Sequence, residues 1–157
     1  MISINSIIGN IFKDTNLLKE DLEKLKMSRI DLEKRILRKQ TDKGTDVGVT
    51  LDSGIKLQHG DVIGDDTKKI VIEQIPEKVI SVKLKKNSQN IATLLGHIIG
   101  NRHRPIAIND KAILFPIQED SELEIFERLF KEIIEDIELN IKEEIFSPHT
   151  SADVHEH

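Results

Sequence analysis

The six histidines of this 157-residue chain are the side chains whose chemistry is most informative. Cysteine is absent, so any transition-metal site must use nitrogen and oxygen ligands rather than thiolate. Imidazole nitrogen suits nickel, copper and zinc alike. The placement of the histidines therefore decides which metal sites the chain can form.

His103 ends the run Gly100-Asn101-Arg102-His103, at the end of a helix predicted to begin near residue 88. At about 100° per residue it falls away from the apolar stripe of that helix, which predicts an exposed side chain. A cation there would meet the negative end of the helix dipole, which is mildly favourable. One imidazole does not hold a transition metal tightly, but a two-fold dimer would bring the same residue from both chains to one axis. A surface histidine that binds no ligand is the alternative reading.

Three more histidines, His149, His155 and His157, follow Ile145 in a polar segment. We expect residues 146–157 to form a disordered tail. Histidines in such a tail can wrap a borderline metal ion, although a solvated tail without this role is the alternative. The candidate metal ligands are therefore His103, His155, His157 and His149.

The other two histidines have no assigned role. His97 precedes His103 by six residues, a spacing that does not place the pair on one helix face. His59 lies in the predicted turn His59-Gly60-Asp61. Both are expected to be surface or turn residues.

The sequence contains no motif typical of an enzyme active site. No phosphate-binding glycine loop, no G-x-S-x-G elbow and no thiol nucleophile is present. The carboxylates along residues 122–144 recur at helical spacing, which indicates a solvated face. We expect a protein that is not an enzyme.

The elements that must position the histidines form two domains of an α+β protein. Residues 1–76 are expected to be a β-rich domain, with a strand over residues 1–13, a hairpin over residues 35–51 and a strand over residues 70–75. The leucines between residues 17 and 36 recur at near-helical spacing, so the structure of residues 17–28 is left open.

Residues 77–145 follow a β-α-β-β-α-β order, which is the ferredoxin-like pattern. The first helix is expected to begin after Ser88 and to carry its apolar residues on one face. The second helix is expected to begin at Asp120-Ser121, and its inward-facing apolar residues continue as far as Ile134. A last strand alternates at Ile137, Leu139 and Ile141. His103 falls between the first helix and the following strand.

Composition excludes several partners. The formal net charge is −5, and the aromatic residues are five Phe with no Trp or Tyr, which argues against a nucleic-acid-binding surface. No apolar run reaches the length of about 18 residues of a membrane span, and no signal peptide is recognisable. A cytoplasmic protein is the default expectation.

The segment Leu95 to Ile106, which contains Gly-Asn-Arg-His and the following Pro105, resembles the signature of the urease accessory protein UreE family. The stretch from Arg35 to Leu51, followed by His59 to Ile63, resembles the N-terminal domain of that family. These motifs span most of residues 1–145.

The resemblance implies a partner-binding or peptide-binding N-terminal domain and a homodimer formed through the ferredoxin-like domain. It also implies that His103 pairs across the dimer axis and binds nickel(II). The family delivers nickel for the urease active site with the accessory GTPase UreG and the urease apoprotein complex. Zinc(II) and copper(II) could occupy the same site, because imidazole ligands do not separate these ions from nickel.

Two departures from the family pattern are visible. Some members have a histidine pair before the second helix of the metal-binding domain, where residues 115–120 of this chain contain no histidine. Some members also have a cysteine near the start of that domain, and this chain has no cysteine. One interfacial ion per dimer is therefore expected. The alternative function is an adaptor of the urease maturation complex that binds metal incidentally.

Overall fold

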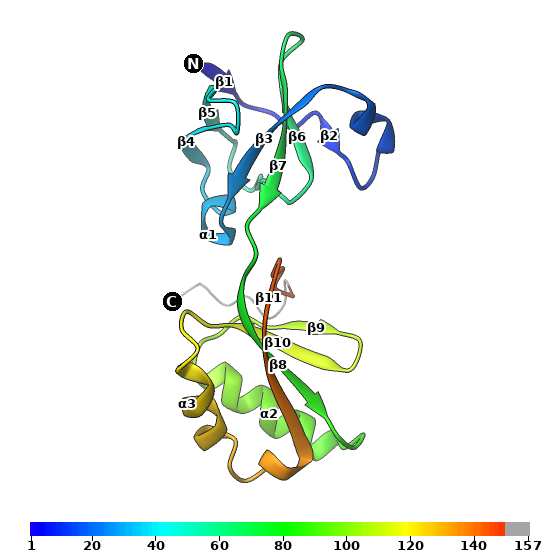
Figure 1. The fold of residues 1–157 in the computed structure, drawn as a ribbon, viewed down its shortest axis with the longest axis vertical. Helices are drawn as coiled ribbons and strands as arrows, with labels where there is room; N and C mark the ends of the chain where they lie inside the picture. The colour runs from blue at the N-terminus through cyan, green and yellow to red at the C-terminus, as the bar shows by residue number, and fades with distance from the viewer. Residues whose placement is uncertain (150–157) are drawn as a thin grey trace. The chain divides into compact units, whose positions relative to one another are not determined.

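The computed structural model describes residues 1–149 and shows an α+β protein (Figure 1). The chain divides into two compact units, Met1–Ile75 and Pro76–His157. Within residues 1–149, no helix has the length and apolar character needed to cross a membrane.

The first unit is built from two sheets, with strand orders β1-β5-β4 and β2-β6-β7-β3. Its elements are β1 (Ile2–Ile4), β2 (Gly9–Asn10), the 3-10 helix η1 (Thr15–Lys19), β3 (Leu22–Met27), α1 (Arg29–Leu32), β4 (Ile36–Gln40), β5 (Asp46–Thr50), β6 (Asp61–Gly64) and β7 (Lys69–Gln74). The predicted hairpin is confirmed, because β4 pairs antiparallel with β5 and Gly44 in the connection has a φ of 82°.

One expectation for the first unit needs correction, and one segment whose structure the sequence left open can now be assigned. The single strand expected over residues 1–13 is two short strands, and β1 and β2 belong to different sheets. The near-helical leucine spacing is misleading over Leu22–Met27, which is the strand β3, parallel to β7. Glu23, Leu25 and Met27 are the buried residues of β3. Burial therefore alternates with the period of two that is typical of a strand, not with the helical period suggested by the leucines.

A buried carboxylate joins β3 to the loops of the first unit. Glu23 is 7% exposed, and its Oε1 accepts hydrogen bonds from Thr41 Oγ1 and Thr45 Oγ1, each at 2.6 Å. Lys68 Nζ lies 3.1 Å from Glu23 Oε2. The hydrogen bonds from Thr41 and then Thr45, together with the Lys68 ammonium, lower the pKa of Glu23 to about 2 against the opposing effect of burial.

We expect the Glu23→Gln variant to be less stable than the wild type at neutral pH. The folded state favours the ionised carboxylate, so this advantage is complete above the ordinary pKa of 4.5 and declines as the pH falls towards 2. Urea unfolding at several pH values between 7 and 3, followed by circular dichroism, measures the difference. A difference that stays constant across this range would contradict the role of Glu23, and Asp21→Asn, at a side chain that is 96% exposed, is the matched control.

The second unit is a four-stranded antiparallel sheet with the order β11-β8-β10-β9. Its elements are β8 (Glu77–Leu84), α2 (Gln89–Asn101), β9 (Ala107–Asn109), β10 (Ala112–Pro116), α3 (Glu122–Leu129), the 3-10 helix η2 (Ile134–Asp136) and β11 (Ile137–Glu144). In chain order these elements follow the β-α-β-β-α-β pattern of ferredoxin-like domains.

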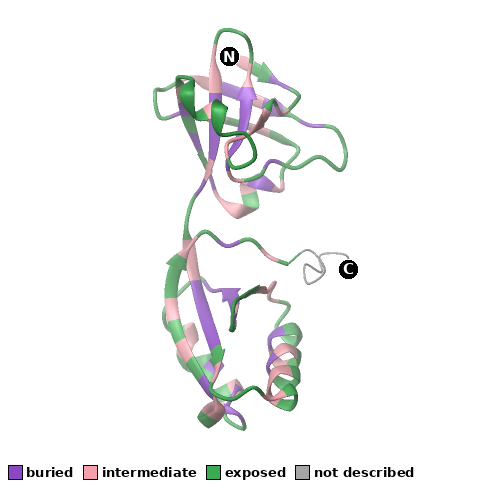
Figure 2. Ribbon diagram, turned by 90° about the vertical axis from the view of Figure 1, so that its right-hand side faces the viewer, coloured by how far each residue is buried: buried purple, intermediate pink, exposed green. Residues whose placement is uncertain are grey.

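The core of the second unit lies between the sheet and its two helices, as the buried segments in Figure 2 indicate. Ser88 caps α2 by accepting a hydrogen bond from the Ile91 amide at 3.3 Å, and Leu95 and Ile99 are the buried residues of this helix. Phe115 of β10 is fully buried against the rings of Phe126 and Phe130.

The helix expected to reach Ile134 is shorter. Regular α3 ends at Leu129, and the chain then makes tight turns in which the Ile133 amide donates to the Phe130 carbonyl at 2.8 Å. Phe130 and Ile133 still face the core and are 0% and 2% exposed. The prediction that these residues face the core is therefore confirmed, but the backbone that carries them forms tight turns instead of a continued α-helix.

Residues 146–149 do not form the disordered tail expected from the sequence. Phe146 is 1% exposed and packs with Val79 and Leu114 on the sheet face opposite the two helices. Three residues later, the His149 amide donates to the Ile106 carbonyl at 2.7 Å. A polar segment with one large apolar residue can therefore be held by that residue, and the rest of the expected tail lies outside the described residues.

Candidate metal centre

His103 lies on the turn that follows α2, and its side chain is exposed as expected. Its φ is 56°, in the left-handed region that few residues other than glycine occupy, and its amide donates to the Gly100 carbonyl at 3.0 Å. A non-glycine residue in this conformation costs about 1–3 kcal/mol and persists where its surroundings fix it. His103 therefore sits on a defined turn at the carboxyl end of a helix, where the dipole favours a cation.

The neighbouring Arg104 anchors this turn to a distant part of the second unit. Its Nη1 donates to the Pro116 carbonyl at 2.8 Å, and its Nη2 lies 2.6 Å from Glu122 Oε1. The guanidinium carbon is 5.6 Å from the centre of the Phe126 ring. The turn after α2 is thereby tied to the end of β10 and to the start of α3.

The segment that leads into α3 is also engaged in structural contacts. Glu122 accepts hydrogen bonds from the amides of Gln118 and Glu119 and pairs with Arg104. Asp120 Oδ1 lies 3.1 Å from Lys78 Nζ. Among residues 1–149, no group of three or more His, Asp and Glu side chains is close enough to hold a metal ion.

The candidate tail ligands are only partly described. His149 has an exposed side chain, and its backbone is bonded to Ile106, three residues after His103. His155 and His157 lie outside the described residues. Whether these histidines share a metal with His103 stays a prediction.

The histidines without an assigned role both have local partners. His97 Nε2 and Asn101 Nδ2 are 3.2 Å apart on the exposed side of α2. His59 Nδ1 accepts from the Gln74 amide at 3.0 Å, and its ring centre lies 5.3 Å from that of Phe12. A backbone donor on this nitrogen gives His59 a structural task in the turn before β6.

The sequence identified His103 but not the Arg104–Glu122 pair. These residues are 18 positions apart, and neither one carries a local signal for the other. They meet because the turn after α2 lies against the end of β10 and the start of α3.

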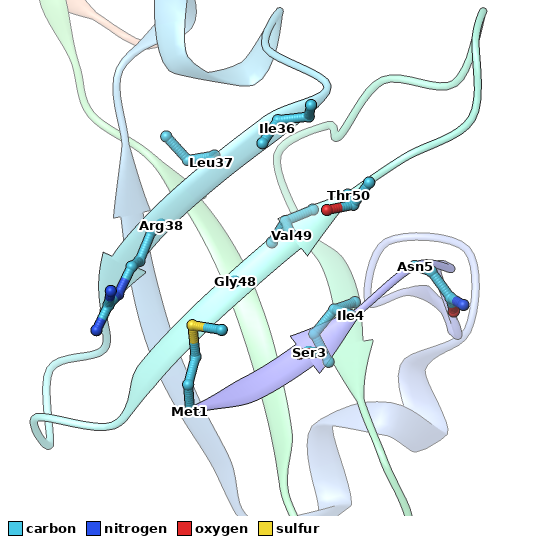
Figure 3. A pocket seen from close by; sticks show the side chains of 10 residues that line it. All are labelled: Met1, Ser3, Ile4, Asn5, Ile36, Leu37, Arg38, Gly48, Val49 and Thr50. Carbon is cyan, nitrogen blue, oxygen red and sulfur yellow. The ribbon is translucent and has the colours of Figure 1, made fainter.

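The first unit has a hollow on the outer face of its three-stranded sheet (Figure 3). Its volume is about 430 Å³, and its walls include Met1, Ile36 and Arg38. Gly48 forms part of the floor, where a Cβ atom would lie 3.1 Å from the Met1 sulfur. The ten residues that line the hollow include no histidine.

Known proteins match this chain over most of its length. Residues 4–75 match the model of the UreE urease accessory protein N-terminal domain. The urease accessory protein UreE of Staphylococcus epidermidis is 34% identical over 135 residues, which cover 83% of each chain. The UreE protein of Streptococcus vestibularis is 27% identical over 152 residues, which cover 96% of this chain and 97% of the relative. The chain therefore belongs to the urease accessory protein UreE family.

Proposed function

We propose that this protein is a nickel-binding metallochaperone that delivers nickel(II) for assembly of the urease active site. It acts in the cytoplasm as a homodimer, together with the GTPase UreG and the urease apoprotein complex, and it catalyses no reaction of its own. The observation that carries the proposal is the exposed His103, held on a fixed turn at the carboxyl end of α2. Membership of the UreE family supports a role in urease maturation, and nickel(II) is the cargo that we propose for this histidine.

The chemistry of the proposed site follows from its ligand type. The His103 side chains of the two protomers supply a pair of imidazoles at the dimer axis, and the helix ends add a favourable field. Imidazole binds metal in its neutral form, so nickel uptake should weaken at acid pH. His149, His155 and His157 are proposed to complete the coordination, and zinc(II) or copper(II) would compete for the same nitrogens.

A cargo carrier must release its ion as well as bind it. We expect the nickel-loaded dimer to activate the urease apoprotein complex, in the presence of UreG and GTP, more strongly than the same total nickel buffered by a chelator. The reason is that nickel passes directly from the dimer to the urease apoprotein complex while the two are bound, without competition from the chelator. Urease activity after a fixed incubation measures the difference.

The His103→Ala protein, mixed with the same nickel, is the control and should activate no better than buffered nickel alone. Equal activation by buffered nickel, by the wild type and by His103→Ala would contradict delivery. This result would favour the adaptor function.

The second candidate is an adaptor of the urease maturation complex whose metal binding is incidental. The hollow on the face of the β1-β5-β4 sheet favours it, because an open sheet face of this size can receive a partner segment (Figure 3). An adaptor would bind the GTPase equally well with and without nickel or zinc, and equally well after His103→Ala. The metallochaperone proposal requires that the metal or His103 changes this binding.

A further inference from the structure

We propose that Glu122 and Arg104 are positioning residues that hold the His103 turn ready for metal binding. This inference rests on the proposed function, because it takes His103 as the metal ligand. Neither residue is proposed to touch the ion. Each acts on the ligand through the backbone of the turn that follows α2.

The first step is the rigidity of Arg104. Its guanidinium has three separate contacts, which are the Pro116 carbonyl at 2.8 Å, Glu122 Oε1 at 2.6 Å and the face of Phe126 at 5.6 Å. Phe126 is 2% exposed and belongs to the core of the second unit. A planar guanidinium held at two nitrogens and stacked on a core ring has little freedom to move, and its backbone directly follows that of His103.

The second step is the rigidity of Glu122 itself. Its Oε1 accepts a hydrogen bond from Arg104 Nη2. Its Oε2 accepts hydrogen bonds from the Gln118 amide at 2.5 Å and from the Glu119 amide at 3.1 Å. Burial opposes ionisation of this carboxyl group, but the amides of Gln118 and Glu119 and the Arg104 guanidinium outweigh it and lower the pKa of Glu122. Both oxygens of the carboxylate are therefore used to join the His103 turn to the amino end of α3.

The third step is the conformation that the pair sustains. His103 has a φ of 56°, which a non-glycine residue keeps only where neighbouring contacts fix the chain. On its amino side the turn is fixed by the hydrogen bond from the His103 amide to the Gly100 carbonyl, at 3.0 Å. On its carboxyl side the fixed group is the Arg104 side chain. Because a two-fold site uses His103 twice, any loosening of the turn affects both ligands of the ion.

The position of Arg104 gives Glu122 a second effect. A guanidinium beside a metal ligand repels the incoming cation, and the paired carboxylate offsets that charge. Loss of Glu122 would leave Arg104 unbalanced next to the site as well as less fixed. Both effects lower metal affinity in the same direction.

The test compares nickel binding by the wild type, Glu122→Gln, Arg104→Lys, His103→Ala and Glu124→Gln, all as full chains. Glu124 is the matched control, because it is an exposed carboxylate in the same first turn of α3. Outer-sphere partners of metal ligands typically contribute 10–100-fold in affinity, so we expect Glu122→Gln and Arg104→Lys to weaken nickel binding about 10-fold or more. Glu124→Gln should bind within about twofold of the wild type.

Electron paramagnetic resonance of copper(II) bound to the same proteins separates positioning from general destabilisation. A loosened ligand turn should change or broaden the copper signal of Glu122→Gln and Arg104→Lys. A variant that only lowers the melting temperature would keep the wild-type signal. Native mass spectrometry should find the wild-type share of dimers in both variants, and a loss of dimer in step with nickel would assign the pair to assembly and overturn the inference.

The outcomes also separate this inference from the proposed function. If His103→Ala loses nickel while Glu122→Gln and Arg104→Lys bind within twofold of the wild type, the positioning role is wrong and the function stands. If His103→Ala binds as the wild type does, the proposed site itself is wrong. Arg104→Lys keeps the positive charge but not the planar fork, so it gives a result even where Glu122→Gln fails to fold.

Discussion

The His103→Ala variant should lose more than about 100-fold in nickel affinity. This expectation exceeds the 10–100-fold that typically follows the loss of an outer-sphere partner, because a directly bound imidazole is removed from both protomers at once. Isothermal titration with nickel, in competition with a chelator of known affinity, measures the loss. The exposed position of His103 on its turn means that the substitution should leave folding stability almost unchanged.

His97→Ala is the matched control for this experiment. Both histidines are exposed, and His97 lies on α2 with Asn101 as its hydrogen-bond partner. We expect His97→Ala to bind nickel as the wild type does. A similar loss in the two variants, or none in either, would contradict the assignment of His103.

The Phe115→Ala variant should destabilise the second unit by about 3–5 kcal/mol, which is the usual cost of removing a buried phenylalanine ring. Phe115 is 0% exposed, and its ring centre lies 4.6 Å from that of Phe126 and 6.5 Å from that of Phe130. Its loss opens a cavity at the centre of the packing between the sheet and the helices. Urea unfolding followed by circular dichroism measures the effect.

Ile108→Ala provides the control for Phe115→Ala. Ile108 lies in β9 of the same sheet but is 63% exposed, so its truncation should change the free energy of unfolding by no more than about 0.5 kcal/mol. Equal effects of the two substitutions would contradict the location of the core. Nickel binding by Phe115→Ala should fall only to the extent that the unit unfolds.

Elements with a strong local signal could be predicted from the sequence. The helix that carries Leu95 and Ile99 has a serine cap and an apolar stripe, and it appears as α2. The hairpin around Gly44 combines a turn residue with flanking strands, and it appears as β4 and β5. In each case the local preference and the tertiary packing favour the same conformation.

Elements decided by distant contacts could not be predicted. The leucines of Leu22–Met27 suit a helix or a strand, and the parallel pairing with β7 selects the strand. Phe146 follows a charged strand and precedes Pro148, so nothing local shows that it packs on Val79 and Leu114. Because Phe146 packs on the sheet, a chain that ends at Ile145 would lose this core residue, whereas one that ends at His149 would keep it.

The candidate site shows the same division. His103 could be found because a short motif surrounds it and because it falls off the apolar stripe of α2. The Arg104–Glu122 pair depends on the arrangement of α2, β10 and α3, and therefore required the structure.

The most direct test of the central claim, that two copies of His103 share one nickel ion, is native mass spectrometry of mixed dimers. Wild-type and His103→Ala chains that both end at His149 are mixed, so that Phe146 is kept and His155 and His157 cannot contribute. We predict one nickel ion on the wild-type dimer and none on the mixed dimer or the His103→Ala dimer at the same nickel concentration. Nickel on the mixed dimer at the wild-type level, or on monomers at the level of wild-type dimers, would contradict a ligand pair shared across the two-fold axis.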